Sequence, residues 1–145
     1  MAIIKSVSTQ AVVFVGICFC QNIFAEGFDY YEHINKYTKC EAVQNVVANI
    51  LSETEEKFYQ HESHHASLDS RIIALEFARA GKYEEGLIDE LYHTYLDAYR
   101  DLLEQSEDVE KFTASLKPQV TKCKKLNEMQ EDILRRKRQE KINNK

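Results

Sequence analysis

Hydrophobic residues recur along the chain at steps of three and four positions, which is the spacing of one face of a helix. From about residue 29 to 61 this spacing predicts a first long helix, with a break near Tyr37 left open. The polar stretch at 62–67 then predicts a turn. After it, Ser67 or Asp69 can cap a second helix that ends at Gly81. The inner face expected for the first helix comprises Cys40, Val43, Val47, Ile50, Leu51, Thr54 and Phe58.

A third helix is predicted from about residue 83 to 105, and its apolar residues cover about half of its circumference. A helix that packs on a core usually has an apolar stripe of about 100°. Either two neighbouring helices pack against this wide face, or part of it contacts a partner or a ligand. If the face holds a binding site, we expect that site at Tyr92, Leu96, Tyr99 and Leu103.

The helical spacing continues from Val109 to Leu134, behind an N-cap at Ser106. Pro118 lies inside this run and is expected to kink the helix or to begin a new one. We find no alternating strand pattern and no Asn-Gly or Asp-Gly hairpin turn. Four or five amphipathic helices joined by short turns predict an all-α fold, a small antiparallel helical bundle without a sheet.

Residues 1–25 have the composition of a secretory signal peptide. Lys5 is their only charge, the stretch 11–20 is apolar, and the small residue Ala25 precedes Glu26. This apolar stretch is shorter than the roughly 20 residues that span a membrane. We therefore predict cleavage after Ala25 and secretion without stable membrane insertion, with a retained anchor as the alternative. The mature chain would comprise a helical domain at 26–138 and a disordered basic tail at 139–145.

Cleavage after Ala25 would leave two cysteines, Cys40 and Cys123. In an oxidising compartment two cysteines most simply pair with each other. Such a disulfide would join the first helix to the last. Two free thiols, or a bridge between two chains, are the alternatives.

Charge is divided unevenly along the chain. Residues 26–116 carry 8 basic and 20 acidic side chains, whereas residues 117–145 carry 10 basic and 4 acidic ones. Because phosphate contacts need concentrated positive charge, we expect no nucleic-acid partner for the acidic domain. The basic end could contact polyanions weakly or complement acidic neighbours within the protein.

The densest basic run is Arg135, Arg136, Lys137 and Arg138. It matches the cleavage pattern of furin-like convertases, and an exposed terminal segment is easily cut. Processing after Arg138 is therefore a further hypothesis. It would release residues 139–145.

The segment 61–65 matches H-E-x-x-H and in this respect resembles the zincin metalloproteases. On a helix His61 and His65 share one face. The resemblance implies that they bind zinc, that Glu62 activates a bound water and that Glu85 is a third ligand. Zincins hold their substrate on the edge of a β-sheet, and no strand is predicted upstream of the motif. We therefore expect no enzyme activity and no cofactor, with zinc binding as the alternative.

These observations favour a small secreted, non-enzymatic helical protein that binds another molecule. The partner would be a protein surface or a small hydrophobic ligand held between helices. A carrier of a lipid or an odorant-like ligand is one form of this hypothesis. A zinc-binding or metalloprotease-like protein is the other class, and the sequence alone does not identify the ligand.

Overall fold

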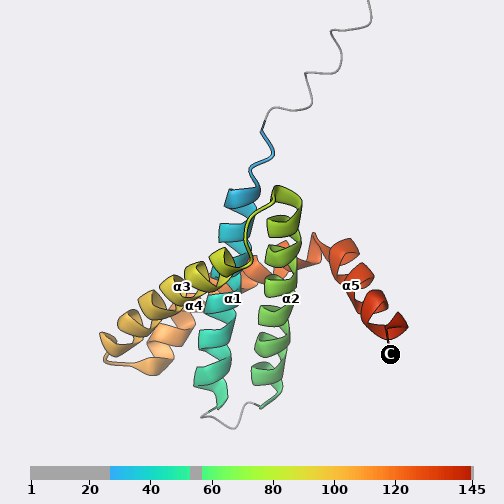
Figure 1. Cartoon of the computed structure of the whole chain (residues 1–145). Coiled ribbons are helices and arrows are strands. Elements are labelled where there is room, and N and C mark those ends of the chain that lie inside the picture. Colours follow the sequence, from blue (N-terminus) through green and yellow to red (C-terminus); the bar gives the residue numbers. More distant parts are fainter. Residues whose placement is uncertain (1–26, 53–56, 145) are drawn as a thin grey trace, which may run out of the picture.

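The computed structural model describes residues 27–52 and 57–144, so the predicted signal peptide lies outside the described residues (Figure 1). Five helices account for most of the described chain. They are α1 (Tyr30–Ser52), α2 (Lys57–Gly81), α3 (Gly86–Glu104), α4 (Val109–Glu128) and α5 (Glu131–Asn143). No strand occurs in these two stretches, and the prediction of a small all-α bundle is confirmed. None of the five helices is long and apolar enough to cross a membrane.

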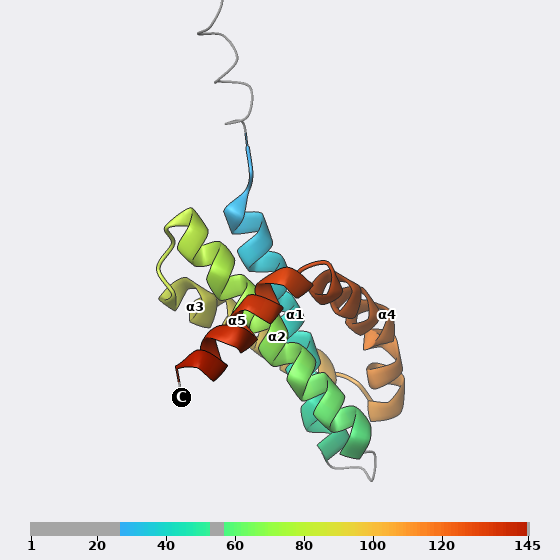
Figure 2. The same ribbon diagram turned by 90° about the vertical axis from the view of Figure 1, so that its right-hand side faces the viewer.

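Helix α1 is the central element of the bundle. It forms a long hairpin with α2, and α3 and α4 also pack against it (Figures 1 and 2). Between residues 37 and 48, every residue except Lys39 and Asn45 is buried. A helix enclosed on several sides needs apolar or hydrogen-bonded residues around its whole circumference, which is why α1 has no continuous polar face.

The predicted boundary between the first two helices is wrong. Helix α1 ends at Ser52 rather than near residue 61, and the stretch 62–67 lies inside α2 instead of forming a turn. Within that stretch Ser67 is buried and its hydroxyl donates to Asn45 Oδ1 at 3.0 Å, whereas Glu62, His64 and His65 are exposed. The stretch is therefore part of a helix with Ser67 turned toward α1 and most of its other polar residues exposed, and its polar composition alone does not distinguish it from a solvated turn.

The other two predicted irregularities do not break their helices. Helix α1 is continuous through Tyr37, whose hydroxyl donates to the Leu126 carbonyl at 3.0 Å. Helix α4 is likewise continuous through Pro118, and the last helix begins later, at Glu131. Because α5 extends to Asn143, residues 139–143 are helical rather than the disordered tail that the sequence predicted.

Two groups of buried side chains form the core. The first surrounds Cys40 and Cys123 and joins α1, α3 and α4; it comprises Cys40, Ala42, Val43, Val46, Val47, Leu96, Tyr99, Phe112, Leu116 and Cys123. The second joins α1 and α2 to residues of α3 and α5; it comprises Ile34, Tyr37, Ile73, Ala74, Ala78, Ile88 and Leu134. Both groups draw on α1, so this helix connects the two halves of the core.

The end of α2 lies directly against the start of α1. Helix α2 ends at Gly81, as predicted, and Lys82 follows with a φ of 60°. A Cβ on Gly81 would lie 2.7 Å from the Cβ of Tyr30. Glycine is therefore required for this close approach of the start of α1 to the end of α2.

The predicted pairing of Cys40 with Cys123 is confirmed. The disulfide connects α1 to α4, with the two Cα atoms 5.4 Å apart. It lies inside the first core group, where both cysteines are 3% exposed. The bond thus holds α4 against the central helix at a site that water does not reach.

Replacing Cys40 and Cys123 by serine should lower the free energy of unfolding by about 4–5 kcal/mol, because the bridge constrains a long loop in the unfolded chain. The two cysteines are 83 residues apart. Guanidinium unfolding followed by circular dichroism measures the effect, and the reduced wild type is the matched control. If the double serine variant and the reduced wild type both unfolded at the same midpoint as the oxidised wild type, this contribution of the disulfide would be contradicted.

Candidate functional site

A cleft of about 820 Å³ lies between α1, the first half of α2, and α4. Clefts of this size accommodate small organic ligands. Its apolar lining comes from all three helices and includes Val47, Ile50, Leu51, Ala66, Val109 and Val120. The apolar residues of α1 that line it belong to the face that the sequence predicted to be internal.

Charged side chains of both signs line this cleft. Glu62 on α2 and Lys124 on α4 form an ion pair with Nζ and Oε1 2.8 Å apart. Glu110 and Lys117 also line the cleft, and both are exposed. Because the Glu62–Lys124 pair is exposed, it contributes little to stability, but it links α2 to α4 beside the cleft.

Gln44 is the buried polar residue of the cleft lining. Its side chain is fully buried, and the Ser70 hydroxyl on α2 lies 2.9 Å from Gln44 Oε1. The same hydroxyl lies 3.0 Å from Asn127 Oδ1 on α4, and Asn127 Nδ2 donates to the Ala66 carbonyl at 3.0 Å. The Nε2 atom of Gln44 has no hydrogen-bond partner among the described residues.

A second polar contact joins α1, α2 and α3, with Glu41 buried and Asp89 exposed. Arg71 on α2 donates to Glu41 Oε1 at 3.0 Å and also to Asp89. Glu41 is only 4% exposed, and its Oε2 atom has no hydrogen-bond partner in the described structure. Burial raises the pKa of the Glu41 carboxyl, while the hydrogen bond and the charge of Arg71 oppose this increase and the charge of Asp89 adds to it.

The four residues predicted to form a ligand surface on α3 pack inward. Leu96 and Tyr99 are each 6% exposed and belong to the first core group, and Tyr92 and Leu103 are half-buried against the same group. The Tyr99 hydroxyl accepts a hydrogen bond from Gln119 on α4. Packing against α1 and α4 therefore accounts for the wide apolar arc of α3. A ligand surface at these residues stays a prediction, and none of them lines the cleft.

The structure does not bring the predicted zinc ligands together. His61 and His65 are exposed on α2, and Glu62 pairs with Lys124. Glu85 lies beyond the other end of α2 and accepts hydrogen bonds from Arg79. From His65 to Gly81, α2 spans about 24 Å at 1.5 Å per residue. Among residues 27–52 and 57–144, no three His, Cys, Asp or Glu side chains are grouped so that they could hold a metal ion.

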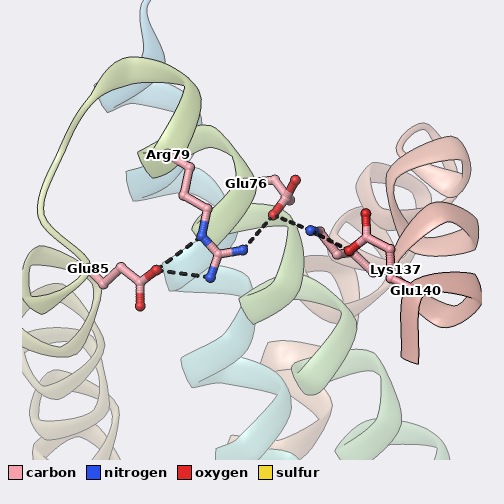
Figure 3. A network of polar contacts seen from close by, with 5 residues as sticks. All are labelled: Glu76, Arg79, Glu85, Lys137 and Glu140. Carbon is pink, nitrogen blue, oxygen red and sulfur yellow. Dashed lines mark hydrogen bonds and ion pairs between the residues drawn. The ribbon is translucent and has the colours of Figure 1, made fainter. Parts of the chain in front are cut away.

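The basic run at 135–138 lies on α5, where several of its cations pair with acidic side chains. Lys137 contacts Glu76 at 3.1 Å and Glu140 at 2.8 Å (Figure 3). Glu76 also accepts a hydrogen bond from Arg79, so one carboxylate joins two cations between α2 and α5. These contacts support the expectation that basic residues near the end of the chain complement acidic neighbours. Convertase cleavage there stays a prediction, and it would require local unwinding of α5.

Arg138 extends the same contact between α5 and α2. It lies 3.5 Å from Asp69 and 3.2 Å from Glu131. Burial raises the pKa of the Asp69 carboxyl, and the charge and hydrogen bond of Arg138 oppose this increase. The basic end of the chain thus contacts part of the acidic domain directly.

The sequence analysis did not identify the polar residues inside the cleft. Gln44 lies between Val43 and Val47 in a segment predicted to be core, and Ser70 lies in the second predicted helix. A polar residue at a buried helical position is the signal that could have identified Gln44. Its partners could not be predicted, because α2 and α4 approach it from distant parts of the chain.

No family model matches the chain, and comparisons with curated proteins and with solved structures find no match. The function is therefore inferred from the geometry and chemistry of the residues themselves.

Replacing Glu41 by glutamine should change how stability depends on pH. A carboxyl whose pKa is raised by folding stabilises the folded state below its unfolded pKa, and this contribution is lost as pH rises through the folded pKa. Relative to the wild type, Glu41→Gln should therefore become progressively more stable as pH rises above 4.5, the ordinary value for this group. Each unit of pKa difference corresponds to about 1.4 kcal/mol.

Urea unfolding between pH 4 and pH 8 measures this difference. Glu104→Gln, on the exposed surface of α3, is the control for the loss of one negative charge. The expected role of burial would be refuted if the difference in the free energy of unfolding between Glu41→Gln and the wild type stayed constant over this range. A change with pH in the opposite direction would also refute it.

Proposed function

We propose that the protein is a small secreted, non-enzymatic binding protein that holds a small apolar ligand in the cleft between α1, α2 and α4. The observation that carries the proposal is the cleft itself. It has an apolar lining from three helices and charged residues at its rim. An apolar interior with a few polar groups is the usual composition of a small-molecule site.

A small ligand suits this cleft better than a protein partner does. The site is concave and its apolar residues lie along the walls, whereas partner surfaces usually present a broad contact area with aromatic anchors. Two of the large exposed apolar residues, Tyr59 and Val109, line the cleft, whereas others such as Phe28, Leu102 and Met129 are spread over different elements. Scattered apolar residues of this kind are normal on a protein surface.

The disulfide and the predicted signal peptide support a location outside the cell. Disulfides persist in oxidising compartments, and the bond between Cys40 and Cys123 joins α1 to α4, two of the helices that line the cleft. In this proposal the exported protein carries its ligand in solution, and the disulfide keeps α4 in place beside α1.

Binding of a fluorescent apolar probe, 1-anilinonaphthalene, to the purified oxidised protein should be saturable at one site. Val120→Trp, which places a large ring in the cleft wall on α4, should weaken binding at least about tenfold, or about 1.4 kcal/mol. Fluorescence titration measures both affinities.

Leu102→Trp is the matched control, because Leu102 is exposed on α3 and does not line the cleft. It should bind the probe like the wild type. Both variants introduce a single tryptophan into a chain that has none, so tryptophan emission also reports whether each variant is folded. Absence of probe binding by the wild type, or equal binding by Val120→Trp, would refute the proposal.

A further inference from the structure

We propose that Gln44 is the polar anchor of the cleft and that its ligand is a neutral apolar molecule carrying a hydroxyl group. This inference rests on the proposed function and specifies the chemical class of the ligand. It starts from an amide that is fully buried, lines the cleft and has one atom without a hydrogen-bond partner. Buried polar groups in folded proteins are almost always paired, so an unpaired one in a binding cleft indicates where a ligand group would bind.

The orientation of the Gln44 amide follows from the number of protons around Ser70. Three oxygen atoms lie within 3.1 Å of the Ser70 hydroxyl: Gln44 Oε1, the Ala66 carbonyl and Asn127 Oδ1. A serine hydroxyl has one proton and can donate to one of them at a time. The hydroxyl therefore cannot pair with all three oxygens through its own proton.

The Asn127 amide decides where that proton goes. Its Nδ2 donates to the Ala66 carbonyl at 3.0 Å, which leaves Oδ1 facing the Ser70 hydroxyl. If Ser70 donates to Asn127, the amide of Gln44 pairs with Ser70 when it is turned by 180°, so that Nε2 donates to the hydroxyl. Oxygen and nitrogen of an amide are assigned from such networks, and this assignment gives a donor to the Ser70 hydroxyl, to Asn127 Oδ1 and to the Ala66 carbonyl.

The unpaired atom of Gln44 is then its carbonyl oxygen. Gln44, Ser70 and Asn127 form a chain of donors that ends at the Ala66 carbonyl. Gln44 lines the cleft but this oxygen is buried in the unliganded protein, so a ligand hydroxyl reaches it by displacing the side chains that cover it. The ligand therefore needs a donor, and a hydroxyl is a small neutral group that supplies one.

The charges around the cleft favour a neutral ligand over a carboxylate. Lys117 and Lys124 are exposed, and Lys124 already pairs with Glu62. A carboxylate at Gln44 would lose its hydration beside an uncharged amide that offers it an oxygen. An ester or an ether can only accept hydrogen bonds, so neither would pair with this oxygen.

The test compares three probes with the same ten-carbon chain: 1-decanol, its methyl ether and decanoate. Each is titrated against the protein with bound 1-anilinonaphthalene, and displacement gives its affinity. The alcohol should bind about five times more tightly than the ether or the carboxylate, a ratio typical of one neutral hydrogen bond. This comparison uses the wild-type protein and does not depend on a variant that folds.

Gln44→Met, which keeps the length of the side chain and removes the amide, should bind the alcohol and the ether within about twofold of each other. Gln139→Met on α5 makes the same substitution at an exposed position away from the cleft, and it should keep the wild-type preference. Circular dichroism and thermal unfolding establish that both variants are folded.

Two outcomes separate the inference from the proposed function. If the dye binds but all three probes displace it equally, or if Gln44→Met keeps the preference for the alcohol, the role of Gln44 is overturned and the cleft remains a binding site. If neither the dye nor any probe binds, the cleft is not a ligand site and both proposals fail.

Discussion

Burial of α1 on nearly all sides is the constraint on which the rest of the structure depends. One neighbouring helix cannot cover the whole circumference of α1. Helices α2, α3 and α4 therefore each cover part of α1. The disulfide between Cys40 and Cys123 fixes one of these neighbours covalently. The cleft arises where α4 and α2 both approach α1 without closing completely over its second half.

Polar groups inside the bundle specify how the helices meet. Gln44, Ser70 and Asn127 bring one group each from α1, α2 and α4 to a single buried point. Glu41, Arg71 and Asp89 link α1, α2 and α3 through a contact that runs from the buried Glu41 to the exposed Asp89. Apolar packing tolerates several arrangements of similar volume, whereas hydrogen bonds between buried groups have narrow distance limits. These two contacts therefore favour one arrangement of the helices over its alternatives.

The fold class could be predicted because it depends on local spacing. Helical periodicity, the absence of a strand pattern and Gly81 as a helix end are all properties of short segments. The pairing of Cys40 with Cys123 was predictable because no other partner remained after the expected cleavage. The end of α1 was misplaced because the polar residues at 62–67 lie on a helix, most of them on its exposed side and Ser67 on its buried side. Periodicity cannot separate that case from a solvated turn.

The candidate site could not be predicted for a different reason. Its lining comes from the segments 44–51, 59–66 and 109–124, which no local pattern relates to one another. The wide arc of α3 was an obvious candidate, but Leu96 and Tyr99 are used to cover α1. The unpaired atom of Gln44 can be identified only from the positions of its neighbours on α2 and α4.

The contact between Gly81 and Tyr30 has a consequence near the middle of the hairpin. With no side chain on Gly81, the start of α1 lies directly against the end of α2, and this sets the axial register of the two helices. A slip of one helical turn, about 5.4 Å, would move Ser70 out of reach of Gln44. A missing methyl group at one end of α2 thus helps to align the polar groups that meet near its middle.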